Sequence, residues 1–173
     1  SIKYIDSFCE NNNSVVLCAL TSNYNGKYRV NYSIVTAQEG CSKLIPKISL
    51  LIYIGTVSGD YYTSETMRCA KEWWMVNEDG AYHDRFNKLT AIFSMSENDF
   101  FESYSKKDCK DITLYKEMKS QCDKLLATIP ELPFSNLWIA QTSHKYIPEN
   151  SVVHTAINNS FRSWNFFPLP KSV

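Results

Sequence analysis

The order of apolar and polar residues predicts a hairpin in the first third of the chain. Residues 14–20 form a short apolar run, and residues 27–37 alternate between apolar and polar side chains. Alternation with a period of two is typical of a strand that has one face in water. Asn25 and Gly26 lie between the two runs and are the residue pair that favours a tight turn between antiparallel strands. We therefore expect residues 14–37 to form a hairpin.

The apolar pattern changes in the middle third. Residues 48–54 are rich in Ile and Leu without clean alternation, which predicts a central strand. Apolar residues then recur at helical spacing, so we expect a helix over about residues 64–76 with Thr63 or Ser64 as its cap. Residues 89–95 are predicted to form another strand.

Two more helices are predicted after these strands. Ser96 can cap a short helix that carries Phe100 and Phe101. Residues 112–126 place apolar side chains in one stripe opposite charged ones, as an amphipathic helix does. Pro130 follows this stripe, and proline cannot continue a helix, so we expect the helix to end before it.

Together these elements indicate one α+β domain over residues 1–173. Residues 136–142 and 151–157 are expected to be strands, and an aromatic, proline-rich tail follows them. The sheet would be mainly antiparallel, built from the N- and C-terminal thirds, with two or three helices from the middle third. A chain of 173 residues fits a single core.

The composition disfavours several functional classes. Eighteen basic residues balance eighteen acidic ones, so no overall charge recruits nucleic acid or an anionic membrane. Only 5 glycines are present. Loops that bind nucleotide phosphates are rich in glycine, so we do not expect one here. The longest apolar stretch, residues 48–57, is too short to cross a bilayer. We expect no nucleic acid partner, no membrane span and no cofactor.

The cysteines favour an oxidising compartment. None of them stands in the Cys-x-x-Cys spacing of zinc or redox sites. An even number of dispersed cysteines is typical of a secreted domain with disulfides, although the spacing leaves the pairing open. The alternative is a reduced protein with buried thiols. The predicted disulfide cysteines are Cys9, Cys18, Cys41, Cys69, Cys109 and Cys122.

Glycosylation motifs also favour a secreted protein. Asn12, Asn31 and Asn158 each begin an Asn-x-Ser sequence, which is the acceptor pattern for N-linked glycans. The chain begins at Ser1 without a charged and apolar leader, so we expect that a signal peptide has been removed. A secreted, extracellular protein is the resulting prediction.

Histidines limit the possible chemistry because only 3 are present. His83 and Asp84 could supply two metal ligands, but an adjacent pair alone is a weak pattern, so we expect no metal site. His144 and His154 flank a short connection and would approach each other if residues 136–142 and 151–157 paired. Two imidazoles could then exchange protons as in a metal-free nuclease.

Aromatic residues give the leading functional hypothesis, since they form 14% of the chain. Such side chains dominate the energetic centres of protein interfaces. The alternative for the tail is that it packs across the sheet and completes the core. We expect a secreted, disulfide-stabilised binding protein that recognises a protein partner or a small hydrophobic ligand; the alternative is a small secreted hydrolase using the two histidines. The candidate binding residues are Trp73, Trp74, Phe161, Trp164, Phe166 and Phe167.

Overall fold

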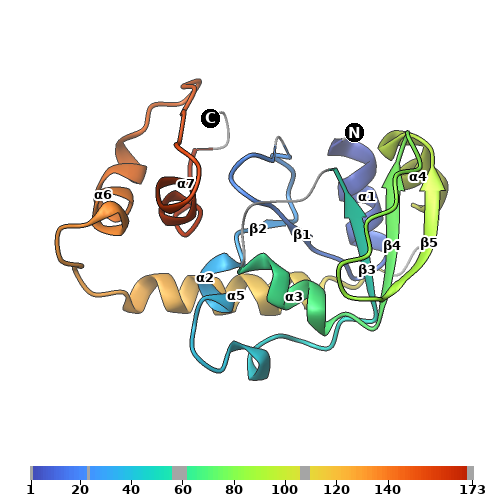
Figure 1. The fold of residues 1–173 in the computed structure, drawn as a ribbon, viewed down its shortest axis with the longest axis horizontal. Coiled ribbons are helices and arrows are strands. Elements are labelled where there is room, and N and C mark those ends of the chain that lie inside the picture. The colour runs from blue at the N-terminus through green and yellow to red at the C-terminus, as the bar shows by residue number, and fades with distance from the viewer. Residues whose placement is uncertain (1, 23, 56–61, 106–109, 171–173) are drawn as a thin grey trace.

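The computed structural model describes residues 2–22, 24–55, 62–105 and 110–170 (Figure 1). The described part of the chain holds 7 α-helices and two sheets, both of them parallel. The helices are α1 (Ile2–Asn11), α2 (Ser33–Thr36), α3 (Thr63–Cys69), α4 (Glu97–Tyr104), α5 (Thr113–Thr128), α6 (Asn136–Ser143) and α7 (Asn159–Trp164). The strands are β1 (Val16–Leu17), β2 (Arg29–Val30), β3 (Leu50–Ile54), β4 (Glu72–Asn77) and β5 (Leu89–Ser94). Short 3₁₀ turns lie at Cys41–Lys43 and His144–Tyr146.

The antiparallel α+β sheet predicted from the sequence is wrong, because the fold is of the α/β type. One sheet has the order β1-β2 and the other the order β3-β4-β5, and all pairs run parallel. Helix α3 connects β3 to β4, which is the kind of crossover that parallel neighbours require. Residues 136–142 belong to α6 instead of a strand, and residues 151–157 carry no regular structure apart from a turn at the last position.

The hairpin predicted for residues 14–37 is also wrong. Val16 of β1 faces Arg29 of β2 in a parallel pair, so the chain between them makes a wide loop instead of a two-residue turn. Gly26 serves a different purpose, because a Cβ atom there would collide with the Tyr24 ring and the Asp6 carboxylate. The missing side chain leaves room for the Tyr24 hydroxyl to donate a hydrogen bond to Asp6 of α1.

The helix predicted for residues 64–76 is half correct. Helix α3 ends at Cys69, Ala70 is extended, and residues 72–77 form β4. Four consecutive large apolar residues, Trp73 to Val76, suit a strand better than a helix because both faces of this strand are covered. β4 pairs with β3 on one side and β5 on the other, so it is the central strand of this sheet. The strand at residues 48–54 is confirmed as β3 but lies at the sheet edge.

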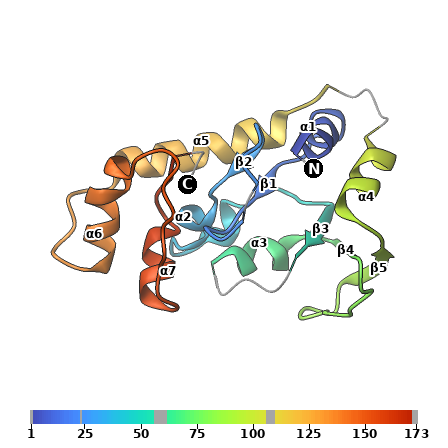
Figure 2. The same cartoon turned by 90° about the horizontal axis from the view of Figure 1, so that it is seen from above.

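Two apolar clusters form the core, and helix α5 joins them. The first cluster packs α1 and α4 against β4, and the second packs α2 and β2 against α5. Tyr115 of α5 contacts both clusters, and its ring meets Tyr28 edge to face at 5.2 Å. Figure 2 shows α5 running along one side of the molecule past β1, β2 and α2. The helix therefore holds the two sheets in one body.

Helices α6 and α7 lie at the opposite end of the molecule from β3, β4 and β5 (Figure 1). Asn165, only 1% exposed, attaches this end to the rest of the chain. Its Oδ1 accepts the Leu20 N–H at 2.8 Å, and its Nδ2 donates to Ser33 Oγ at 2.7 Å. Its backbone carbonyl accepts a hydrogen bond from the Asn31 side chain. Asn165 thus connects the C-terminal helices to two segments near the N-terminus, one at Leu20 and one at Asn31–Ser33.

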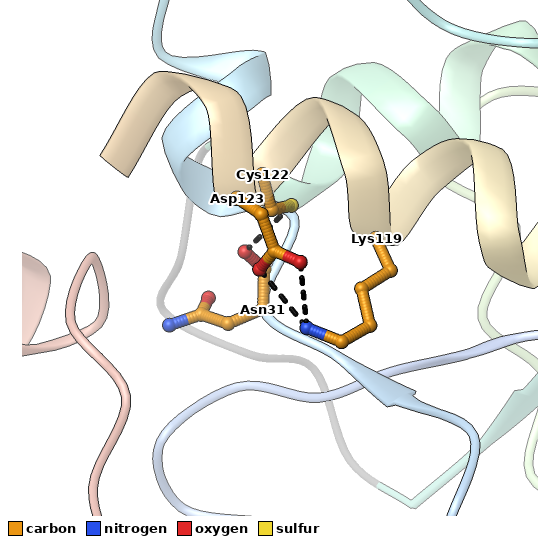
Figure 3. Close-up of polar contacts among 4 residues, drawn as sticks. All are labelled: Asn31, Lys119, Cys122 and Asp123. Carbon is orange, nitrogen blue, oxygen red and sulfur yellow. Dashed lines mark hydrogen bonds and ion pairs between the residues drawn. The ribbon is translucent and has the colours of Figure 1, made fainter. Parts of the chain in front are cut away.

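The predicted disulfide framework is contradicted by the positions of the cysteines. Cys9, Cys18, Cys41, Cys69 and Cys122 are all free thiols, and Cys109 lies outside the described residues. The free cysteines come from separate helices and loops, and no two of them approach to bonding distance. Three are buried, as the alternative of a reduced protein supposes. The Cys122 thiol, for example, donates to the Asn31 carbonyl at 3.4 Å, beside the surface ion pair between Lys119 and Asp123 (Figure 3).

Replacing Asn165 by Ala should destabilise the fold by about 1–3 kcal/mol, because the partly buried Leu20 N–H and the buried Ser33 hydroxyl each lose a hydrogen-bond partner. Asn98→Ala, at an exposed position of α4, is the matched control and should change stability by less than about 0.5 kcal/mol. Urea unfolding of the three proteins measures the difference. Equal midpoints for Asn165→Ala and the wild type would contradict the anchoring role of this side chain.

The thiols should differ strongly in reactivity. Burial raises the pKa of Cys9 to about 12 and that of Cys122 to about 12, so at pH 8 each holds roughly a thousandfold less thiolate than an ordinary cysteine. Cys69 is exposed on α3. N-ethylmaleimide followed by peptide mass mapping should show Cys69 alkylated well before Cys9 and Cys122. Alkylation of all three cysteines at the same rate in the folded protein would contradict the burial of Cys9 and Cys122.

Candidate functional site

An unusual edge strand is the starting point for the site. β3 consists of Leu50, Leu51, Ile52, Tyr53 and Ile54, and each of these side chains is only partly buried. Edge strands in natural proteins are usually protected by charged residues, proline or a covering segment, because their unpaired backbone groups attract other strands. No charged residue or proline interrupts β3. An apolar strand of this kind is normally found in the middle of a sheet.

A groove of about 540 Å³ lies between β3 and the segment that contains β1. One wall is formed by residues 47–54 and the other by residues 12–17, and β1 and β3 lie close together in both views (Figures 1 and 2). Helix α1 contributes Ile5, Phe8 and Cys9 to the lining. The volume falls within the range of ligand-binding clefts, and the lining is predominantly apolar, as such clefts require.

Hydrogen bonds fix the wall opposite β3. The Ser14 N–H donates to the Cys9 carbonyl at 3.1 Å, which ties the wall to α1. Asn13 has a positive φ of 47° and its Oδ1 accepts the Leu114 N–H at 2.8 Å. That second bond joins the wall to the first turn of α5. The groove is therefore held open by two helices that belong to the core, instead of by a loose loop.

The polar groups of the groove are few. Among the described residues that line the groove, Lys47 alone carries a charge, and it stands just before β3. Thr66 of α3 also lines the groove, is fully buried, and has an Oγ1 without a hydrogen-bond partner in the described residues. Burial raises the pKa of Cys9 to about 12, so this thiol is protonated at neutral pH and is a poor nucleophile. The groove has the chemistry of a binding site.

The comparisons with protein families, curated proteins and solved structures find no match to this chain. None of the helices in the described ranges combines the length and the apolar character needed to cross a membrane. Function must therefore be inferred from the groove and the surfaces themselves.

Two of the three tryptophans predicted as binding residues, Trp73 and Trp74, lie in the sheet. Trp73 is 2% exposed, and its Nε1 donates to the Met67 carbonyl at 3.0 Å, so it is part of the core. Trp74 is partly buried among Phe93 and Tyr104, with its Nε1 bonded to Glu72 at 2.8 Å. Their neighbouring positions point to opposite faces of β4. A binding role for them stays a prediction.

The aromatic residues of the tail pack around α7. Phe167 is 4% exposed and its ring stacks on His144 at 5.3 Å. Phe161, Trp164 and Phe166 are partly buried, and Phe166 contacts the second core cluster. The tail thus packs around α7 and against the second core cluster, whereas the alternative considered from the sequence placed it across the sheet. Its binding role also stays a prediction.

A different set of apolar side chains is exposed near the C-terminus. Phe134, Tyr146, Val152 and Ile157 are each at least 75% exposed. They belong to the segments around α6, where the Phe134 ring contacts that of Trp138 at 5.4 Å between ring centroids. No pattern in the sequence marks these residues, because isolated apolar residues in loops have no periodicity. None of the four lines the groove.

The nuclease alternative supposed that His144 and His154 meet across two paired strands. The strands that were to pair around them are absent, since α6 and an irregular segment stand in their place. His144 Nδ1 lies 2.9 Å from the Pro168 carbonyl, and His154 is exposed. Across the described ranges, no group of three or more His, Cys, Asp and Glu residues could hold a metal ion.

The three glycosylation motifs lie in different environments. Asn158 is exposed, whereas the Asn12 side chain donates to the Phe8 carbonyl at 3.0 Å beside the groove. Asn31, expected on a wet face, donates its amide to the Asn165 carbonyl, and its Oδ1 is buried. Glycosylation at Asn31 would require that internal bond to break. Glycosylation of all three stays a prediction.

Asp84 has a structural role. Partial desolvation raises the pKa of its carboxyl, but hydrogen bonds from the backbone N–H groups of the next turn, including Lys88 and Leu89, outweigh this and lower the pKa below its usual range. The distances to those two nitrogens are 3.0 and 3.1 Å. The carboxylate thereby closes the connection between β4 and β5.

The lowered pKa of Asp84 has a predictable effect on stability. A carboxyl whose pKa is lower in the folded state stabilises the protein above its unfolded pKa, and this contribution disappears as the pH falls through the folded pKa. Asp84→Asn should therefore lose less stability than the wild type between about pH 6 and pH 2. Urea unfolding at each pH provides the measurement, with Glu78→Gln, an exposed carboxyl of the same connection, as control. Identical pH profiles for Asp84→Asn and the wild type would contradict the interpretation.

Proposed function

We propose that this protein is a binding domain that takes up an apolar segment of a partner protein in the groove between β1 and β3. The observation that supports the proposal is the apolar edge strand β3 beside a groove of about 540 Å³. We keep the leading hypothesis from the sequence, a binding protein that uses aromatic side chains. The aromatic residues assigned to binding, however, differ from those named from the sequence. Phe8, Tyr53 and Phe101 line the groove.

The energetics of the groove are sufficient for a transient partner. The five side chains of β3 are partly exposed, and completing the burial of an aliphatic side chain contributes on the order of 1 kcal/mol. Apolar side chains of the opposite wall and of the ligand add to this amount. Association also costs translational and side-chain entropy, so affinities near the micromolar range are expected.

A small hydrophobic ligand is the competing occupant named from the sequence. An apolar molecule would satisfy the aliphatic lining but would leave the backbone groups of the strand edge without partners. A polypeptide can satisfy both, which is why a protein segment is the preferred occupant. An extracellular location is a proposal that rests on the glycosylation motifs alone.

Selection of peptides from a random library on the immobilised full-length protein tests the proposal. Selected peptides should be rich in aliphatic residues and should lose at least tenfold in affinity for Leu51→Asp, because a buried carboxylate in the groove is unfavourable. Leu51 belongs to neither core cluster, so this variant should fold.

Ile92→Asp is the matched control for this measurement. Ile92 is 38% exposed on β5, the other edge strand of the same sheet, so the substitution adds the same charge away from the groove. Peptides should bind it as they bind the wild type. Peptides that bind Leu51→Asp normally would place the binding site elsewhere, and specific binding of dodecanoate without any peptide would favour the small hydrophobic ligand.

A further inference from the structure

We infer that the segment bound in the groove carries an uncharged polar side chain that forms a hydrogen bond with Thr66 Oγ1. This inference rests on the proposed function and specifies the chemistry that the partner needs. Thr66 belongs to α3, lines the groove and is 0% exposed. Its Oγ1 has no hydrogen-bond partner among the described residues. The free protein therefore holds a buried hydroxyl that a ligand can satisfy.

Two threonines in other helices satisfy their hydroxyl groups locally. A helical threonine can donate to the carbonyl three or four positions earlier. Thr36 of α2 donates to the Tyr32 carbonyl at 3.3 Å, and Thr142 of α6 donates to the Trp138 carbonyl at 2.9 Å. Thr66 makes no such bond, so its hydroxyl is directed away from the carbonyls of α3. Leaving a buried hydroxyl unpaired costs stability, because no water replaces the missing bond.

The depth of Thr66 indicates which part of the partner reaches it. Every residue of the two walls, 12–17 and 47–54, keeps some exposed surface, whereas Thr66 has none. A side chain extends beyond the backbone of a bound segment, so it reaches deeper than the backbone does. Leu51 and Met67 share the lining and are only partly buried, and such side chains commonly change rotamer when a partner binds.

The lining accepts one polar residue in an otherwise apolar segment. A threonine hydroxyl can donate one hydrogen bond and accept two, so Ser, Thr, Asn and Gln side chains can all pair with it. A charged side chain would be unfavourable beside Thr66, because removing a charge from water at a fully buried position is costly. The inferred partner is an aliphatic segment that contains one uncharged polar residue.

Thr66→Val tests the state of the hydroxyl in the free protein. Val has the shape of Thr without the hydroxyl, so the substitution removes an unpaired buried group. The equilibrium constant between folded and unfolded protein should rise about fivefold or more in urea unfolding. Thr142→Val is the matched control and should not raise it, because the Thr142 hydroxyl already has a partner. An unchanged or lower constant for Thr66→Val would overturn the inference.

A phage-displayed library of random twelve-residue peptides is the binding probe. Peptides selected on the wild type should share one Ser, Thr, Asn or Gln at a fixed place among aliphatic residues. Peptides selected on Thr66→Val should carry an aliphatic residue at that place. Thr66→Ser keeps the hydroxyl and should select the same pattern as the wild type. Selection of one pattern by both the wild type and Thr66→Val would contradict a contact with the hydroxyl.

Synthetic forms of the most enriched wild-type peptide measure the contact directly. The parent peptide and a form with its polar residue replaced by Ala are labelled with fluorescein. On the wild type, the Ala form should bind about tenfold more weakly in fluorescence anisotropy. On Thr66→Val it should bind as well as the parent or better, because the polar residue of the parent then lacks its partner. Equal losses on both proteins would show that the polar residue binds elsewhere.

The outcomes separate the two proposals. If selected peptides lose affinity for Leu51→Asp but respond equally to the wild type and Thr66→Val, the groove binds apolar segments and the role of Thr66 is wrong. If the peptides bind Leu51→Asp and Thr66→Val as they bind the wild type, both proposals fail. The same conclusion holds if no peptide binds the wild type.

Discussion

Pairing of β4 on both of its edges is the constraint on which the architecture of the sheet depends. Trp73, Met75 and Val76 are almost completely buried, and each faces a residue of β3 on one side and of β5 on the other. Because β4 takes the central place, the more aliphatic β3 is left at the edge. The groove is a direct result of this order, since a central β3 would have no free edge to present.

Helix α5 determines how the groove is shaped, although it contributes little to the lining. Its first turn holds Asn13, and therefore the wall that carries β1, while Tyr115 packs against both core clusters. Contacts with α5 consequently fix the distance between the two sheets. A groove whose walls belong to the core needs little reorganisation when a ligand enters, and such preorganisation reduces the entropic cost of binding.

Local patterns predicted local elements correctly. Strand β5, helix α4 with Ser96 as its cap, and the amphipathic α5 are confirmed, and Ser96 Oγ accepts the Asp99 N–H at 3.2 Å. Sheet order, strand direction and the groove depend on which distant segments meet, and periodicity does not carry that information. Residues 64–76 show the difficulty, because their helical spacing ends where Trp73 begins a run favouring strand. Recognising β4 there would have added a second apolar strand directly after residues 48–54, but the position of each strand in the sheet would still have required the structure.

Asn165 also has a consequence for the order in which the molecule assembles. Its contacts with Leu20, Asn31 and Ser33 span 145, 134 and 132 positions of the chain. Contacts between such distant positions close large loops, and proteins rich in them fold slowly. During synthesis, the loop after β1 and the start of α2 wait for this amide until more than 130 further residues have been made. The native contacts of the first third of the fold are thereby completed only after α7 has been synthesised.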